Sequence, residues 1–269
     1  MTKSVIIDEE EGICSTVTGP TGAEHRHLAN SVIEQAIRDA DLSLDQIGYC
    51  VATGYGRMNV PFADSQITEL TCHARGVAKL FPNARTAIDI GGQDAKGLKI
   101  QDGRLKDFVM NDKCAAGTGR FLEVLAETIG LNVKDLGDIS LKSKKRIRIS
   151  SICTIFAEQE IRAQISEGAA IEDIIAGLHE SIAGRVVRMI KRLKIEPDVV
   201  ITGGVAKNSG VIKALREHIG YDIFVPENPL LSGAYGAALL GREIYNKETS
   251  EKRDIRRGIS LKEGVTFFK

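Results

Sequence analysis

The chain has 269 residues, with 36 basic and 36 acidic side chains and 43% hydrophobic residues. The balanced charge disfavours a nucleic-acid-binding protein, and an aromatic content of 5% without Trp argues against a base-stacking surface. No apolar run reaches the ~18–20 residues of a membrane helix, and acidic residues interrupt the apolar N-terminal segment. We therefore expect a cytoplasmic protein with neither nucleic acid nor membrane as a partner.

The five cysteines point away from a disulfide framework, because their number is odd and we expect no signal peptide. The absence of a CxxC pair also disfavours a zinc finger. We expect Cys50 and Cys72 to be core thiols and Cys14 a thiol of a surface loop. The remaining two are either buried thiols or ligands that meet in space from distant loops.

Hydrophobic periodicity predicts strands interleaved with helices, which is an α/β architecture. In chain order we predict strand 4–7, helix 28–40, strand 47–53, helix 67–80, strand 86–90, strands 97–100 and 107–109 joined by a turn, helices 119–129, 154–166 and 171–193, strand 199–202, helix 209–218, strand 223–225 and helix 232–245. A polar tail of mixed charge is predicted over 247–269. The best division into subdomains falls between residues 82 and 86, which gives a first subdomain at 1–85 and a second at 86–231.

The segment Ile88–Asp94 reads as a strand that ends in an acidic turn with paired glycines. Gly91 and Gly92 carry no side chain, so their N–H groups can approach phosphate oxygens. Asp89 and Asp94 have the carboxylates that hold Mg²⁺ through water beside phosphates. The alternative is a glycine hairpin turn with solvated acids.

A second buried strand, Val199–Thr202, also ends in paired glycines, Gly203 and Gly204, and a helix is predicted after it. The N-terminus of that helix would offer free N–H groups to an anion or a nucleotide. The alternative is a turn in which glycine permits close packing. A P-loop and a dinucleotide-binding GxGxxG turn are both absent, and two strand-turn phosphate loops suit the actin/hexokinase-like ATPase fold.

Cys114 and Cys153 each precede a predicted helix, in the segments NDKCAAGTGRF and SSICTIFAE. For either cysteine alone, a structural thiol is the simpler interpretation. Positions at helix N-termini stabilise thiolates and anionic clusters. Two thiolates are too few for a [4Fe–4S] cluster, which needs four ligands, but a two-fold dimer would supply two from each subunit.

At these segments the sequence resembles the BadF/BadG/BcrA/BcrD-type ATPase family over about Thr2 to Tyr245. The resemblance is carried by IDIGGQDAK, MNDKCAAGTGRF, SSICTIFAE and ITGGVAKNSG, together with ATGYGR and LSGAYGAAL, in the family's order. It implies an actin/hexokinase-like fold with two subdomains around a nucleotide cleft. It also implies that the helix at 232–245 packs back onto the first subdomain.

The same resemblance assigns roles to individual residues. It implies that Asp89–Asp94 is the second phosphate loop and Gly203–Asn208 the adenosine loop, and that Cys114 and Cys153 ligate a cluster. The expected catalytic residues are Asp89 and Gln93; the expected nucleotide-binding residues are Gly91, Gly92, Gln93, Gly203, Gly204 and Asn208. ATP, Mg²⁺ and one [4Fe–4S] cluster shared by a homodimer are the implied cofactors.

The implied function is ATP-driven electron transfer. A ferredoxin or flavodoxin would reduce the protein, which would pass a low-potential electron to a 2-hydroxyacyl-CoA dehydratase. The alternative partner is a benzoyl-CoA reductase, in which related chains could form a heterodimer. A sugar kinase or a scaffold of the same fold without a cluster is a further alternative, because fold alone does not determine function.

One family feature is missing from the N-terminus. The family begins with a strand and a phosphate hairpin of the form D-x-G-S-x-x-(S/T)-K, whereas this sequence starts at the end of that hairpin, with Thr2 and Lys3. We therefore expect a truncated first subdomain in which the strand at 4–7 lacks its hairpin partner. Because only one side of the phosphate clamp would remain, we also expect slow ATP hydrolysis.

Overall fold

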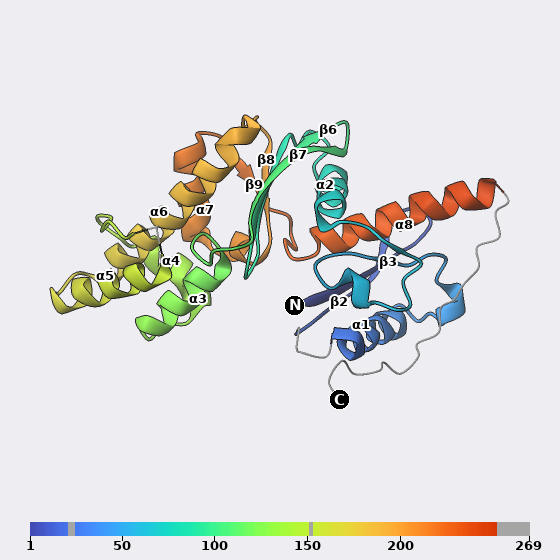
Figure 1. The fold of residues 1–269 in the computed structure, drawn as a ribbon, viewed down its shortest axis with the longest axis horizontal. Helices are drawn as coiled ribbons and strands as arrows, with labels where there is room; N and C mark the ends of the chain where they lie inside the picture. The colour runs from blue at the N-terminus through green and yellow to red at the C-terminus, as the bar shows by residue number, and fades with distance from the viewer. Residues whose placement is uncertain (21–24, 151–152, 252–269) are drawn as a thin grey trace. The chain divides into compact units, whose positions relative to one another are not determined.

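The computed structural model describes residues 1–20, 25–150 and 153–251, and the chain divides into two compact units (Figure 1). Unit 1 comprises Met1–Leu80 together with Leu231–Lys269, and unit 2 comprises Phe81–Leu230. Unit 1 is therefore discontinuous in sequence, whereas unit 2 is one uninterrupted segment.

Unit 2 is built on a five-stranded mixed sheet with the strand order β7-β6-β5-β8-β9. The strands are β5 (Thr86–Ile90), β6 (Ala95–Gln101), β7 (Arg104–Asn111), β8 (Val199–Thr202) and β9 (Ile223–Phe224). Strand β5 is buried along its whole length, pairs antiparallel with β6 and runs parallel to β8. The hairpin between β6 and β7 turns at Asp102 and Gly103, whose φ angles of 52° and 72° suit a tight two-residue turn.

The helices of unit 2 are α3 (Gly119–Thr128), α4 (Leu136–Ser140), α5 (Thr154–Ser166), α6 (Ile171–Ile190) and α7 (Ser209–Ile219). Figure 1 shows α6 lying along one face of the sheet, and α6 contacts both β6 and β7. One hydrophobic core joins these helices to the sheet, with Ile88, Phe121, Ile174 and Leu178 among its most buried members. Burial of that apolar face provides most of the stabilisation of unit 2.

The described part of unit 1 is built from two small sheets and the helices that pack beside them. Strands β1 (Thr2–Ile7) and β2 (Ile13–Gly19) form an antiparallel pair, and β3 (Val51–Ala52) lies parallel to β4 (Ser65–Gln66). The helices are α1 (His25–Asp39), α2 (Glu69–Leu80) and α8 (Ser232–Ser250). Strand β2 pairs with β1 along its length, but it lies downstream, so it does not test the expectation that the upstream hairpin partner of the strand at 4–7 is missing.

Helices α2 and α8 approach each other so closely that glycine is required at the crossing. A Cβ at Gly236 would lie 1.8 Å from the carbonyl oxygen of Cys72, and one at Gly76 would lie 2.0 Å from that of Ser232. Any larger side chain would force the helices apart. The LSGAYGAAL segment thus attaches the end of the chain to unit 1.

Several predicted boundaries are wrong for identifiable reasons. The predicted strand 47–53 is reduced to β3, because the N–H of Cys50 donates to Asp64 Oδ2 at 2.7 Å instead of to a strand. The predicted tail begins too early, because α8 continues through Lys247 to Ser250. The rest of the tail, 252–269, and residues 151–152 lie outside the described residues. None of the helices that the structure describes is both long and apolar enough to span a bilayer.

Candidate functional site

The two glycine turns identified in the sequence follow neighbouring strands of the unit 2 sheet. Strands β5 and β8 are parallel and adjacent, with Asp89 opposite Thr202, so their carboxyl ends lie at the same edge. The turn after β5 contains Gly91, Gly92 and Gln93, and the turn after β8 contains Gly203 and Gly204. In open α/β sheets, ligands bind at the carboxyl ends of strands. The structure therefore brings the two predicted phosphate turns together.

Asp89 is held in a buried network of charges. Its side chain is 7% exposed; Oδ1 accepts a hydrogen bond from the Thr202 hydroxyl at 2.8 Å, and Oδ2 lies 3.5 Å from the ammonium of Lys96. Lys96 is itself 4% exposed and pairs with Asp94 at 2.7 Å. The Lys96 ammonium thus lies between two carboxylates, so each buried charge has a partner. The acids of this turn are thus fixed in place, whereas Gln93 beside them is exposed.

The turn after β5 presents backbone amides to open space. The carbonyl of Gly91 accepts from the N–H of Gly119 at 2.8 Å, and that of Gly92 accepts from the N–H of Arg120 at 2.8 Å. In a trans peptide the N–H points opposite to the C=O, so the amides of Gly92 and Gln93 face away from α3. Within the described residues neither amide has an acceptor, and a Cβ at Gly92 would meet nothing within 4 Å. Paired free amides beside open space form an anion-binding concavity.

The turn after β8 is the second part of this edge. Gly203 has a φ of 85°, and a Cβ there would lie 2.3 Å from the carbonyl oxygen of Ile90, so only glycine fits. The nearest atom to a Cβ built at Gly204 would be a Leu230 methyl carbon at 3.9 Å, which leaves room for a ligand. The predicted helix does not follow directly, because a 3₁₀ turn over Gly204–Lys207 precedes α7. The N-terminus of α7 is therefore set back from the glycines.

Asn208 caps α7 and belongs to a buried polar chain. Its Oδ1 accepts from the N–H of Val211 at 3.0 Å, and its Nδ2 lies 3.2 Å from Nε2 of His179. His179 Nδ1 lies 3.0 Å from the hydroxyl of Ser140, which donates to the carbonyl of Gly137 at 2.7 Å. Because that hydroxyl is already a donor, His179 donates from Nδ1 and accepts at Nε2. Burial lowers the pKa of His179 to about 3, so the imidazole is neutral.

Asn208 is 9% exposed, and its side-chain partners among the described residues are Val211 and His179, not the glycines of the second turn. His179 is the main feature that sequence reasoning missed. The five histidines of the chain form no recognisable pattern, and nothing local to His179 indicates its partners.

The two candidate ligand cysteines precede helices that pack against each other, α3 and α5. Cys153 is the N-cap residue of α5, as its predicted position requires. Cys114 lies five residues before α3, in a turn tied by Asn111, whose Nδ2 donates to the carbonyls of Cys114 at 2.9 Å and Ala116 at 3.2 Å. Both thiols are free and partly exposed. Cys114 lies in a turn before the helix, as predicted, and the first amides of α3 donate to the carbonyls of Gly91 and Gly92.

The surface beside Cys153 is apolar. Ile155 is 64% exposed and Phe156 is 56% exposed on the first turn of α5. Within the described residues, no group of three or more His, Cys, Asp or Glu side chains is placed to hold a metal ion. The described part of one chain thus offers the thiols of Cys114 and Cys153, and two large exposed apolar side chains lie beside Cys153.

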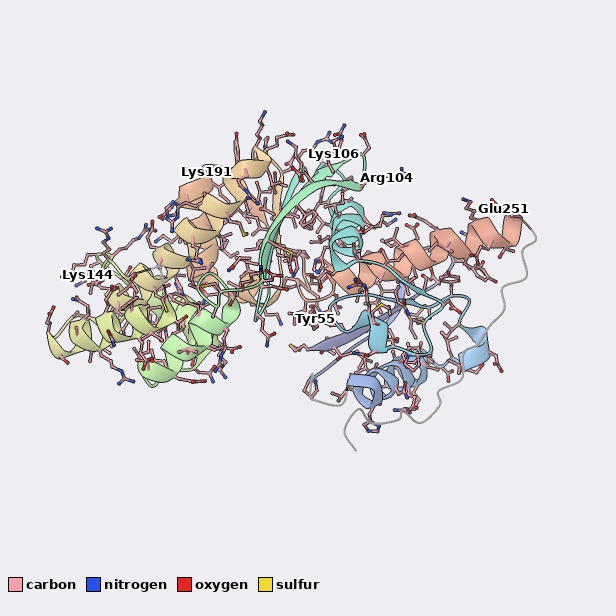
Figure 2. All side chains as sticks on the ribbon, viewed as in Figure 1. Tyr55, Arg104, Lys106, Lys144, Lys191 and Glu251 are labelled. Carbon is pink, nitrogen blue, oxygen red and sulfur yellow. The ribbon has the colours of Figure 1, made fainter. Side chains whose placement is uncertain are left out.

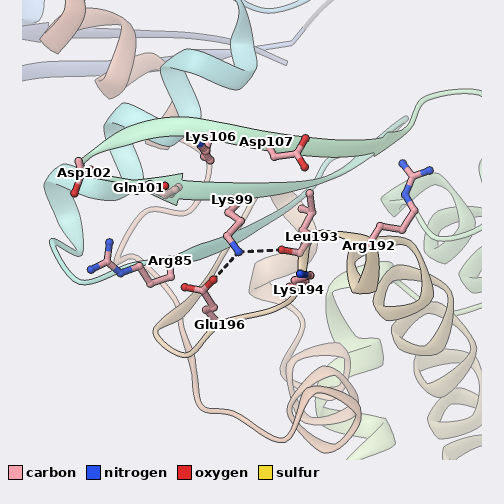
Figure 3. A pocket seen from close by; sticks show the side chains of 11 residues that line it. Arg85, Lys99, Gln101, Asp102, Lys106, Asp107, Arg192, Leu193, Lys194 and Glu196 are labelled. Carbon is pink, nitrogen blue, oxygen red and sulfur yellow. Dashed lines mark hydrogen bonds and ion pairs between the residues drawn. The ribbon is translucent and has the colours of Figure 1, made fainter.

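A separate pocket of about 750 Å³ lies at the opposite edge of the sheet (Figure 3). Its walls include Arg85, just before β5, and Glu196, before β8, so it adjoins the amino ends of these strands. Figure 2 shows Lys106 and Arg104 near the tip of the hairpin that forms its rim. Lys99 bridges its interior by pairing with Glu196 at 2.5 Å. None of the predicted site residues lines this pocket.

Comparisons with known proteins identify the family to which the chain is similar. The model of the BadF/BadG/BcrA/BcrD ATPase family matches residues 1–241. The 2-hydroxyisocaproyl-CoA dehydratase activator of Clostridioides difficile is 48% identical over 259 residues, with 94% of this chain and 95% of that protein covered. A benzoyl-CoA reductase subunit of Thauera aromatica is 32% identical, with 82% of this chain and 80% of that protein covered.

Solved structures agree with the predicted fold. The activator of the 2-hydroxyisocaproyl-CoA dehydratase from Clostridium difficile with bound ADPNP gives a TM-score of 0.86 at 45% identity, covering 95% of this chain and 99% of that one. A ROK family glucokinase from Streptomyces griseus, at 13% identity, shares the fold alone, with a TM-score of 0.51 and coverage of 90% and 99%. The predicted actin/hexokinase-like ATPase fold is confirmed.

Proposed function

The chain belongs to the BadF/BadG/BcrA/BcrD ATPase family, and from that membership we propose that it is the activating ATPase of a 2-hydroxyacyl-CoA dehydratase. The single observation that carries the proposal is the glycine turn after β5, whose free amides and fixed carboxylates lie at the same edge as the turn after β8. Identity of 48% to a dehydratase activator, against 32% to a benzoyl-CoA reductase chain, favours the dehydratase as partner. A reductase-type role is the second candidate.

The nucleotide would bind at the carboxyl edge of the sheet. The amides of Gly92 and Gln93 would donate to phosphate oxygens, and Gly203 and Gly204 would leave space for the rest of the nucleotide. Asp89, fixed by Thr202 and Lys96, would orient the water ligands of Mg²⁺. The exposed amide of Gln93 would orient the attacking water. That a relative has been solved with bound ADPNP supports a nucleotide site in this chain.

Cys114 and Cys153 fit half of an iron–sulfur site. Both thiols are free, and they precede two helices that pack together. A cluster that needs four thiolates would take two from each of two subunits. Ile155 and Phe156, exposed beside Cys153, would be buried in such a homodimer. A [4Fe–4S] cluster held there would supply one-electron transfer at low potential.

In this proposal the protein accepts an electron from a ferredoxin or flavodoxin in the cytoplasm and passes it to the dehydratase. ATP can shift the dimer between two conformations only if it binds one of them more tightly. Asp89 and the free amides of the turn are the groups that distinguish ATP from ADP, because they face the phosphates. Hydrolysis of ATP would therefore let the dimer leave the conformation that binds ATP more tightly.

Iron content tests this proposal directly. The protein is purified without oxygen as wild type, Cys114→Ser, Cys153→Ser and the control Cys14→Ser, and its iron and visible spectrum are measured. Cys14 is an exposed thiol of unit 1, so its replacement leaves the core intact. We expect about four irons per wild-type or control dimer and a loss in both other variants. A colourless wild type after reconstitution, or full iron in Cys114→Ser, would contradict it and favour a kinase or scaffold of the same fold.

A further inference from the structure

We propose that Thr118 is a positioning residue whose hydroxyl switches between two carbonyls and so links the phosphate turn to the turn that carries Cys114. The inference rests on the proposed function, because it requires phosphate at the amides of Gly92 and Gln93. It assigns a route between nucleotide and thiol within one subunit. The Thr118 hydroxyl lies within hydrogen-bond distance of both turns, which gives that route its physical basis.

Thr118 has two possible acceptors and one proton. Its Oγ1 lies 2.8 Å from the carbonyl oxygen of Ala115 and 3.2 Å from that of Gly92. A hydroxyl donates one hydrogen bond, so it can serve only one of these carbonyls fully at a time. The shorter distance assigns the proton to Ala115 when the phosphate turn is empty. In that state the hydroxyl helps to close the turn between Cys114 and Thr118.

The Thr118 side chain does not make the hydrogen bond that is usual at its position. It is the N-cap residue of α3, where Thr normally accepts a hydrogen bond from an amide of the first helical turn. Here the side chain makes no capping bond, and the residue is fully buried. The hydroxyl therefore faces the two carbonyls in a site closed to water.

Phosphate binding would change the balance between the two acceptors. The carbonyl of Gly92 and the N–H of Gln93 belong to the same peptide group. When that N–H donates to a phosphate oxygen, the carbonyl becomes a stronger acceptor, because hydrogen bonds along a chain polarise one another. The Thr118 proton then moves from Ala115 to Gly92. The turn at Cys114 loses one closing bond, whereas the start of α3 gains a further bond to the phosphate turn besides those from Gly119 and Arg120.

Thr118→Val removes the hydroxyl and preserves the shape of the side chain. Folding should survive, because each carbonyl keeps a backbone partner: Ala115 accepts from the N–H of Thr118 at 3.0 Å, and Gly92 accepts from the N–H of Arg120. Thr118→Ser restores the switch. Thr128→Val is the matched control, since it deletes a hydroxyl of the same helix that bonds only within α3.

The test measures amide hydrogen exchange in residues 113–118 of the full chain, purified without oxygen, with and without the ATP analogue AMPPNP. Nucleotide affinity is measured in parallel by calorimetry. In wild type, Thr118→Ser and Thr128→Val, AMPPNP should accelerate exchange there by about fivefold, the effect of one hydrogen bond. In Thr118→Val, exchange should be fast already and unaffected by AMPPNP.

The outcomes separate this inference from the proposed function. If AMPPNP binds wild type but leaves exchange in 113–118 unchanged, the Thr118 switch is refuted and the nucleotide site stands. An equal acceleration in Thr118→Val also refutes the switch. Failure of wild type to bind AMPPNP refutes the nucleotide site itself, and the switch falls with it.

Discussion

His179 should make unit 2 sensitive to acid in a way that one substitution removes. Burial lowers the pKa of the folded imidazole to about 3 from its ordinary value of 6.5, so the folded protein excludes the proton that the unfolded chain accepts. The stability due to the neutral imidazole is present above pH 6.5 and is lost as the pH falls toward 3.

The size of the pH effect on stability follows from protonation of this histidine in the unfolded chain. At pH 5 a histidine with a pKa of 6.5 is almost fully protonated, which favours unfolding by about 2 kcal/mol; at pH 7 the effect is about 0.2 kcal/mol. The difference of about 2 kcal/mol does not depend on the exact folded pKa, provided that this lies below about 4. His179→Gln cannot titrate, yet its amide can still bond Ser140 and Asn208.

The assay is urea unfolding of wild type and His179→Gln at both pH values, followed by circular dichroism. The free energy of unfolding of wild type exceeds that of the variant, and this difference should shrink by about 2 kcal/mol between pH 7 and pH 5. His27→Gln, on the exposed face of α1, controls for the loss of one histidine while keeping the buried imidazole. If the difference in free energy of unfolding between wild type and His179→Gln stays constant with pH, the assignment of His179 as a buried neutral donor and acceptor is refuted.

Three further substitutions test the geometry elsewhere. Gly236→Ala should destabilise unit 1 by about 3 kcal/mol, because its methyl group would overlap the Cys72 carbonyl, whereas Gly56→Ala, in open space, should leave the melting temperature nearly unchanged. Gly204→Val should weaken AMPPNP binding by at least about tenfold without lowering the melting temperature. Gly203→Ala should instead destabilise unit 2. If Gly204→Val binds AMPPNP as tightly as wild type, the turn serves packing only. Asp89→Asn should lower the ATPase rate by about 100-fold, as expected when charge stabilisation is lost, whereas Thr202→Val, which removes one bond to the same carboxylate and keeps its charge, should cost far less.

The glycine turns were predictable because their cause is local. A short apolar strand followed by paired glycines has few conformations, and the parallel pairing of β5 with β8 follows once two such strands are placed in one sheet. Strand β2 was not predicted, because ICSTVTG carries small polar residues and only weak alternation. Helix α4 was missed since Leu136–Ser140 is too short to show helical periodicity.

The polar interior of the site could not be read from the sequence, because its partners are distant in the chain. His179 is 39 residues from Ser140 and 29 residues from Asn208. The pairing of Asp89 with Thr202 spans 113 residues. No local pattern encodes such contacts. Those of His179 depend on how α4, α6 and α7 pack together, and that of Asp89 depends on the pairing of β5 with β8.

The discontinuity of unit 1 has a consequence for biosynthesis. Its N-terminal part, up to Leu80, leaves the ribosome long before α8, at Ser232–Ser250, is translated. Until then the face of α2 around Gly76, which α8 covers in the finished protein, is left uncovered by that helix. Unit 2 is one uninterrupted segment and can close its own sheet first, since domains fold as units during synthesis. The nascent chain therefore carries an incomplete first unit through most of its translation, and a ribosome that stalls before Ser232 leaves a product for chaperones or proteases.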